Sequence, residues 1–220
     1  METAVSPAFD GSVADRTVER ALAARHSAYL EEVRRLIDAG VAVMRRGQST
    51  DPRVSEIVSE AGLSNQAFYR HIRSKDELLL AILDDGLRQL VGYLEHQMSK
   101  ETSGLGKVRR WTEGILAQAV DPTAAEATRG VTINAARLGK LFPEEFRRTE
   151  ELIEAPVRAA IEAAVDQGEL EAADPDRDGA AAYRLVMGTM QSHLTNDTRP
   201  SKADVEHLVG FVIGGIGGRH

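Results

Sequence analysis

The segment from Val54 to Leu78 constrains the fold more than any other part of the sequence, because its pattern predicts two short helices joined by a tight turn. We expect the first helix to begin at Asp51-Pro52, where an acidic cap precedes a proline at the first helical position. It should end at Gly62, which adopts the left-handed conformation at little steric cost. The apolar residues of this helix recur on one face, and they are Val54, Ile57, Val58 and Ala61.

A second short helix follows this turn directly. Ser64 is a favourable N-cap for it, and on a helical projection Phe68 and Ile72 face the first helix while the opposite face is polar. The next helix begins with Ser74 and Glu77 in the pattern of a capping box. Two helices and a fixed turn on a helical support are the layout of a helix-turn-helix DNA-binding domain. Two-helix corners also occur as simple packing motifs, so that alternative stays open.

The outer face of the second helix carries side chains suited to DNA. Asn and Gln can pair with the N6 and N7 edge of adenine, Arg can pair with guanine in the same way, and a small Ala can touch a thymine methyl group. The expected base-reading residues are Asn65, Gln66, Ala67 and Arg70. Phosphate oxygens can accept from a hydroxyl, a ring N–H or an ammonium group, and these are supplied by Tyr69, His71 and Lys75.

The residues from Val54 to Leu78 resemble the helix-turn-helix of the TetR family of bacterial transcriptional regulators. The resemblance rests on an ordered set of residues around an apolar core of Ile57 and Phe68. That set comprises Gly62, Leu63, Ser64, Tyr69, His71, Lys75 and Leu78. It covers a small part of the chain, and the remainder is similar to the family in length and helical organisation.

The resemblance implies a recognition helix over residues 64–71 in a homodimer that binds a pseudo-palindromic operator, most commonly as a repressor. It implies a small-molecule inducer or corepressor in the rest of the chain. The residues expected to position the DNA backbone are then Arg53, Ser64, Tyr69, His71 and Lys75. The chain departs from the family at Ile72, where Phe is common, and at Arg53, where Thr is usual; an ion pair with phosphate would replace a hydroxyl contact at Arg53.

Charge and composition are compatible with this interpretation. The net charge is −7, but residues 1–75 carry 11 basic and 10 acidic residues, so the excess acid lies in the remainder. Only charge close to phosphate contributes to counterion release, so an acidic body does not prevent binding by a nearly neutral head. No apolar stretch could span a membrane, no secretory signal begins the chain, and there is no cysteine, which together predict a cytoplasmic protein.

Helical patterns continue through the chain and predict an all-α protein in three parts. Residues 1–26 lack sustained periodicity and are expected to form a flexible arm, residues 27–75 the helix-turn-helix domain, and residues 76–220 a ligand-binding and dimerisation domain. The first firm helix is expected from Ala28 to Arg46. Its inward residues should be Leu30, Val33, Ile37 and Met44.

The body pattern predicts one helix up to Met98 and five more beyond a polar hinge. Pro156 should kink or split the third of these five, since proline removes a helical hydrogen bond. Their expected ranges are 105–120, 122–138, 143–167, 175–195 and 202–213.

Apolar stripes on the last two of these helices are candidates for a dimer interface, because one short recognition helix reads few bases and two heads are needed for specificity. The candidate interface residues are Leu185, Val186, Val205, Leu208, Val209 and Val212. The same stripes could equally be internal core of a monomer.

Several body residues could surround a ligand pocket with apolar walls and a few polar groups. These candidates are Trp111, Ile115, Asn134, Arg137, Phe142, Met187, Met190 and His193. Each could instead be plain core. The scarcity of aromatic residues, 5% of the chain, favours an aliphatic or acyl-bearing ligand.

The sequence contains no convincing pattern for a metal site or for catalysis. Residues 174–179 resemble the opening of a calcium loop, but Leu185 stands where the bidentate Glu belongs. The histidines show no metal-ligand spacing, so we expect no metal or cofactor. No nucleophile–base pair can be assembled from the sequence. The competing interpretation is a helical enzyme or small-molecule carrier whose two-helix corner is only structural.

Overall fold

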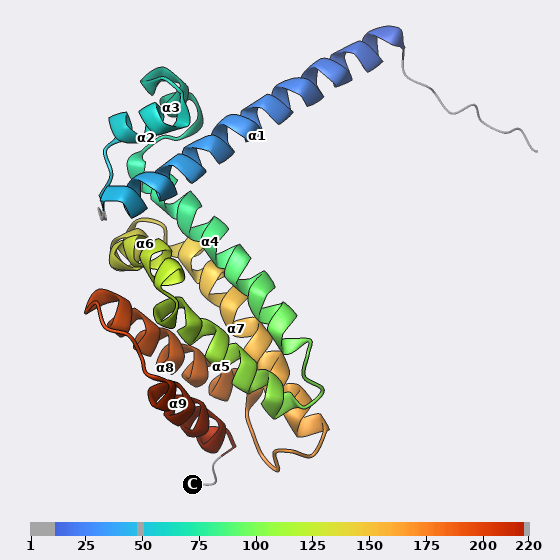
Figure 1. The fold of residues 1–220 in the computed structure, drawn as a ribbon. Coiled ribbons are helices and arrows are strands. Elements are labelled where there is room, and N and C mark those ends of the chain that lie inside the picture. The colour runs from blue at the N-terminus through green and yellow to red at the C-terminus, as the bar shows by residue number, and fades with distance from the viewer. Residues whose placement is uncertain (1–11, 48–50, 218–220) are drawn as a thin grey trace, which may run out of the picture.

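The structure is a computed structural model that describes residues 12–47 and 51–217. All regular structure in these residues is helical (Figure 1), which confirms the predicted all-α class. The helices are α1 (Val13–Gly47), α2 (Val54–Ala61), α3 (Asn65–His71), α4 (Lys75–Met98), α5 (Gly104–Val120), α6 (Pro122–Leu141), α7 (Pro143–Asp166), α8 (Pro175–Thr195) and α9 (Lys202–Gly215). None of these helices is long and apolar enough to cross a membrane.

The head consists of α2 and α3 packed against α1, with the first turns of α4 packed on α1 and sharing the same apolar core (Figure 1). Gly62 ends α2 with φ of 62°, and the Ser64 hydroxyl caps α3 by accepting from the Ala67 N–H at 3.1 Å. Both features are as predicted. The predicted start of α2 at Asp51-Pro52 is wrong, because the helix begins at Val54. Arg53 is its N-cap, and the Arg53 N–H donates to the Glu56 carboxylate at 3.0 Å. The buried apolar residues of the head are Leu36, Ala39, Met44, Ile57, Val58, Ala61, Phe68, Ile72, Leu78, Leu79 and Ile82, joined by Leu138 of α6.

The prediction of a flexible N-terminal arm over residues 1–26 is wrong for the part that the structure describes. Residues 13–26 are helical and continuous with the rest of α1, while residues 1–11 lie outside the described residues. The N-terminal half of α1 extends away from the other helices (Figure 1). A helix that buries no face needs no apolar stripe, so periodicity alone could not reveal it; its several alanines favour helix by intrinsic propensity.

The inward face of α1 also differs from the expectation. Leu30 is 54% exposed because it precedes the region where α1 meets α2 and α4, and Val33 and Ile37 are half-buried. Met44 is buried as predicted. The buried apolar residues of this helix are Leu36, Ala39, Val43 and Met44.

The body is built around α5, which packs against α4, α7, α8 and α9. Trp111 of α5 is fully buried, and its indole N–H donates to the Ile153 carbonyl oxygen of α7 at 3.0 Å. Gly104 starts α5 so close to α7 that a Cβ there would lie 2.3 Å from the Ala164 nitrogen. The predicted body helices are confirmed within a few residues, except that α7 runs through Pro156 without being split.

Candidate nucleic-acid interface and ligand cavity

The outer face of α3 is a compact set of exposed side chains. Asn65, Gln66, Tyr69 and Arg70 are exposed, whereas Phe68 is fully buried beneath them. The Tyr69 ring packs edge-to-face on Phe68 with centroids 5.1 Å apart. The Tyr69 side of this face is therefore supported by the buried ring of Phe68.

Ala67 does not share this face, contrary to the prediction that it reads bases. Only 8% of Ala67 is exposed, so its methyl group lies inside the head. Ala67 and Phe68 lie four and three residues before His71, so these three side chains share the inward face of α3. The helix ends at His71, and Ile72 is buried from an extended backbone with φ of −125° and ψ of 122°.

His71 corrects a second expectation, since it does not reach outward to phosphate. Its side chain is 1% exposed and lies between α3 and α1. There its Nε2–H donates to the Glu32 carboxylate, and its ring packs edge-to-face on Tyr29 with centroids 4.2 Å apart. Its Nδ1 is buried without a hydrogen-bond partner. His71 therefore joins the recognition helix to α1.

Glu32 also binds Arg70, the neighbour of His71. The Arg70 Nη2 lies 2.5 Å from the Glu32 Oε2, the same oxygen that accepts from His71. The hydrogen bond from His71, and to a smaller extent that from Arg70, holds the pKa of Glu32 below its ordinary value. Sequence reasoning missed Glu32, because a contact to a residue 38 positions away leaves no local pattern.

The expected phosphate contacts other than His71 lie on the surface or near it. Arg53, Ser64 and Tyr69 are exposed. Lys75 at the start of α4 is half-buried and pairs with Asp51 at 2.5 Å, a hydrogen bond that lowers the pKa of Asp51. A phosphate would compete with this carboxylate for the ammonium group.

The capping box that precedes Lys75's helix is formed in part. The Ser74 hydroxyl accepts from the Glu77 N–H at 3.1 Å, as predicted. The Glu77 carboxylate accepts from the Arg73 N–H at 2.5 Å instead of from Ser74. The start of α4 is nevertheless fixed on both sides, which positions Lys75 relative to α3.

A cavity of about 590 Å³ lies where the head meets the body. Its walls come from α1, α4, α5, α6, α7 and α8. Apolar or small residues make up somewhat more than half of the lining and come from all of these helices except α5, which contributes Gln118. The polar residues on its walls include Gln118, Thr128, Thr132, Thr149, Tyr183 and Gln191. Burial raises the pKa of Tyr183 above its ordinary value, with Glu150 and Glu154 adding to the effect, so its phenol stays neutral.

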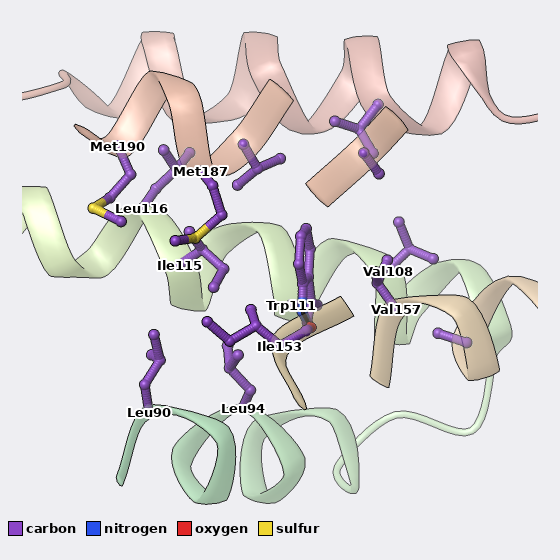
Figure 2. Close-up of a cluster of buried hydrophobic side chains, with 14 of the residues drawn as sticks. Leu90, Leu94, Val108, Trp111, Ile115, Leu116, Ile153, Val157, Met187 and Met190 are labelled. Atoms are coloured by element: carbon purple, nitrogen blue, oxygen red, sulfur yellow. Dashed lines mark hydrogen bonds between the residues drawn. The ribbon is translucent and has the colours of Figure 1, made fainter. Parts of the chain in front are cut away.

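Met187 and Met190 are the members of the predicted pocket set that line this cavity. Trp111 and Ile115 are instead fully buried between helices of the body, with the two methionines at one end of the same cluster (Figure 2). Both belong to the packed core because α5 is covered on several sides, a situation that a helical stripe cannot distinguish from a pocket wall.

The other four predicted pocket residues have different partners. The Asn134 amide donates to the Gly130 carbonyl oxygen and its oxygen accepts from Arg137, which also pairs with Asp76 of α4. Phe142 packs against the head core. The Nδ1 of His193 forms a hydrogen bond with the Thr198 hydroxyl oxygen at 2.9 Å. None of these four lines the cavity.

The predicted dimer stripe proves to face inward for the most part. Val186, Val209 and Val212 are buried within the protomer, and Val205 and Leu208 are half-buried against the body core. Leu185 is exposed. The exposed large apolar residue of α9 is Phe211, 62% exposed, with exposed glycines before and after it at 210, 214 and 215. Val186, Val209 and Val212 are therefore unavailable to a partner, because α8 and α9 bury these side chains on their own body.

Residues 36–82 match the model of a family described as bacterial regulatory proteins, tetR family. This match spans the C-terminal half of α1, the helix-turn-helix and the first turns of α4. No curated protein matches the chain.

Solved structures with the same fold cover most of the chain. A TetR transcription regulator from Haloarcula marismortui is 18% identical with a TM-score of 0.66, over 82% of this chain and 94% of its own. The fatty acid degradation regulator FadR from Bacillus halodurans is also 18% identical, with a TM-score of 0.64 over 86% and 97%. FadR from Bacillus subtilis, solved in complex with stearoyl-CoA, is 19% identical with a TM-score of 0.59 over 84% and 98%.

Proposed function

We propose that this protein, whose residues 36–82 match the model of the tetR family of bacterial regulatory proteins, is a ligand-responsive repressor that binds a pseudo-palindromic operator as a homodimer in the cytoplasm. The observation that carries this proposal is the exposed face of α3, where Asn65, Gln66 and Arg70 lie on the surface while Phe68 anchors the helix in the head core. Side chains of these types read adenine and guanine edges in the major groove.

The phosphate contacts proposed for this head flank the reading face. Tyr69 and Ser64 offer hydroxyl groups, Arg53 a guanidinium, and Lys75 an ammonium group next to the N-terminus of α4, where an anion is favoured. Ala67 and His71 are left out of the DNA contacts because they are buried. They support α3 from within.

A short recognition helix needs a second copy, so we place the dimer interface on the exposed side of α8 and α9. Leu185 and Phe211 are the large apolar residues exposed there. Gly188, Gly210 and Gly214 are exposed beside them and leave the helix backbone bare. A helix of the partner could approach such a surface closely and cover Phe211 and Leu185. Symmetric pairing of this kind places two heads on one operator.

The proposed effector site is the cavity between head and body. Its volume of about 590 Å³ suits a drug-sized ligand. The apolar walls formed by Met187, Met190 and their neighbours would accept an aliphatic or acyl chain, and the stearoyl-CoA bound by a FadR of the same fold supports this ligand class. The charged residues on the lining are mainly carboxylates, Asp38, Asp85 and Glu150, with Arg45 as the basic member. They favour a ligand whose anionic group stays outside.

Helix α1 would connect this site to DNA binding. Ile37, Val41 and Arg45 line the cavity, and about one to four turns earlier on the same helix Tyr29 and Glu32 hold His71 of the recognition helix. A ligand that shifts α1 relative to α4 would therefore shift α3. Such a ligand changes DNA affinity by its differential affinity for the two arrangements.

A gel-shift titration of the full-length protein with the DNA upstream of its own gene tests the proposal. We expect a sequence-selective complex whose affinity falls steeply with salt, since counterions are released from phosphate. Native mass spectrometry of the same protein purified from cells should give the dimer mass and reveal any retained small molecule. Binding that shows neither sequence selectivity nor salt dependence would favour the carrier or enzyme alternative.

A further inference from the structure

We propose that Glu32 of α1 is a positioning residue that fixes the base-reading orientation of Arg70. The inference deepens the proposed DNA reading and rests on it. Glu32 lies outside the helix-turn-helix, yet its carboxylate is the group that Arg70 contacts on the outer face of α3.

The first step is that Glu32 itself is held in place. Its Oε2 accepts from the Nε2–H of His71, whose ring is 1% exposed. Tyr29, almost one turn before Glu32 on α1, packs on the same ring. A carboxylate bound to a buried and packed imidazole has little rotational freedom. Glu32 is therefore an immobile acceptor at the edge of the recognition helix.

The second step is that the fixed carboxylate of Glu32 restricts the conformations of the Arg70 side chain. An exposed ion pair between two flexible side chains contributes little, because both must be ordered to form it. Here one partner is already ordered, so only Arg70 loses freedom. The Arg70 side chain is 58% exposed while its Nη2 stays 2.5 Å from Glu32, which leaves its other N–H groups available.

The third step concerns what an oriented guanidinium does. Reading guanine requires two parallel N–H donors aimed at O6 and N7. A guanidinium that gives one Nη2–H to Glu32 keeps its second Nη2–H, which forms a pair of parallel donors with the neighbouring Nε–H or Nη1–H. The contact with Glu32 holds that pair in one orientation, whereas an untethered guanidinium must be ordered by the base itself. Ordering before binding lowers the entropic cost of the specific contact. It gives no advantage on phosphate, where many orientations serve.

Two effects of Glu32 on DNA therefore oppose each other, and they can be separated. Its negative charge weakens binding to every sequence, and its contact with Arg70 strengthens discrimination at one base pair in each half-site. Glu31 is the neighbouring residue of α1, exposed and similar in charge, so Glu31→Gln removes the same charge without removing the contact. It is the matched control for Glu32→Gln.

The experiment uses the full-length protein and a duplex library with a randomised central segment. Selection with the wild type gives a preferred duplex. Equilibrium binding by fluorescence anisotropy then compares that duplex, all its single-base variants and an unrelated duplex, for the wild type, Glu32→Gln, Glu31→Gln, Arg70→Ala and the double variant Glu32→Gln/Arg70→Ala. Thermal unfolding checks that each variant is folded.

We expect Glu32→Gln to lower discrimination about five- to tenfold at the base pair where Arg70→Ala abolishes it. Its binding to the unrelated duplex should equal or exceed that of the wild type. Glu31→Gln should keep full discrimination. In the Arg70→Ala background, Glu32→Gln should change discrimination at no position, because it acts through Arg70.

Unchanged discrimination in Glu32→Gln, or an equal change in the presence and absence of Arg70, would overturn the positioning role while leaving DNA reading intact. A wild-type selection that enriches no sequence would overturn the proposed DNA reading itself, and this inference with it. If Glu32→Gln lowers the unfolding temperature, all binding measurements are made at a temperature at which thermal unfolding shows every variant to be folded, so that the comparison of Glu32→Gln with the wild type and with Glu31→Gln still decides the question.

Discussion

The head and the body of this protein pack in opposite ways. The head places Phe68 and Ile57 at zero exposure around a seven-residue recognition helix, and polar contacts from Glu32 and Arg35 of α1 fix that helix and the turn before it. The body has more helices, yet a cavity of about 590 Å³ remains between it and α1 of the head, beside Met187 and Met190. A close-packed head keeps one geometry, whereas a body with a cavity can respond to being filled.

Helix α1 belongs to both regions, so a change at the cavity can reach the closely packed head. Its Leu36 and Ala39 are in the head core, and Ile37 and Val41 line the cavity. The Arg35 guanidinium donates to the Gly62 carbonyl oxygen at 3.3 Å and to that of Ala61, at the end of α2. A displacement of α1 by a ligand would thus be transmitted to the whole helix-turn-helix as a unit.

The largest expected effect tests the packing of the head. Phe68→Ala should destabilise the protein by about 3–5 kcal/mol, because it removes a fully buried ring and leaves a cavity under α3. Met190→Ala, beside the existing cavity, should cost about 2 kcal/mol, the lower end of its range. Urea unfolding measures both. Equal losses from the two substitutions would contradict the contrast between the regions.

The next effect tests the proposed dimer surface of the body. Phe211→Glu should weaken association by about 2 kcal/mol or more, as expected of an aromatic residue at the centre of an interface. Sedimentation equilibrium should then show monomer. Leu141→Glu, at an exposed apolar residue of α6, is the matched control and should remain dimeric. Retention of the dimer in Phe211→Glu would place the interface elsewhere.

A smaller effect separates reading from positioning on the head. Gln66→Ala should cost about 1–3 kcal/mol on the preferred duplex and relax the preference at one base pair. Binding to unrelated DNA should be unaffected, because the amide contributes nothing to phosphate. Competition binding against single-base variants measures this. A uniform loss over all duplexes would show that Gln66 is not a reader.

Lys75→Ala should act in the opposite manner. It removes a phosphate contact, so binding to all sequences should weaken alike, and the slope of log affinity against log salt should fall by about one unit for each head. A salt titration by anisotropy gives the slope directly. An unchanged slope would mean that Asp51 keeps Lys75 paired in the complex as well.

The smallest effect concerns pH and the link between α1 and α3. The folded state lowers the pKa of Glu32, so the unfolded chain binds the proton more readily. The contribution of this carboxylate to stability is present above its ordinary pKa and is lost as pH falls through its lowered value. Glu32→Gln should therefore show a shallower loss of stability in acid than the wild type. Identical pH dependence of stability in Glu32→Gln and the wild type would contradict a stabilising contact between Glu32 of α1 and His71 of α3.

Local features of the head could be predicted from the sequence because they depend on neighbours in the chain. Gly62 and Ser64 act through conformation and capping within a few residues, and the structure confirms both. The inward side of α3 could be predicted only in part: Phe68 and Ile72 are buried as expected, but Ala67 and His71 are buried as well, because α1 covers a wider face of this short helix than the pattern indicates. Glu32 could not be found at all, since it meets α3 only through the fold.

The body resisted prediction for a different physical reason. An apolar stripe has the same spacing whether it covers a core, a ligand or a partner, so Val209 and Trp111 could not be assigned from periodicity. The structure places both in the protomer core. It leaves Phe211, which the stripe did not include, on the surface.

The most direct test of the account is the affinity of the full-length protein for its selected duplex and for an unrelated one of equal length, measured in the same salt. The account predicts that the selected duplex binds at least about a thousandfold more tightly, and that Gln66→Ala reduces this ratio while Lys75→Ala leaves it nearly unchanged. Equal affinity for the two duplexes would contradict the claim that the exposed face of α3 reads DNA.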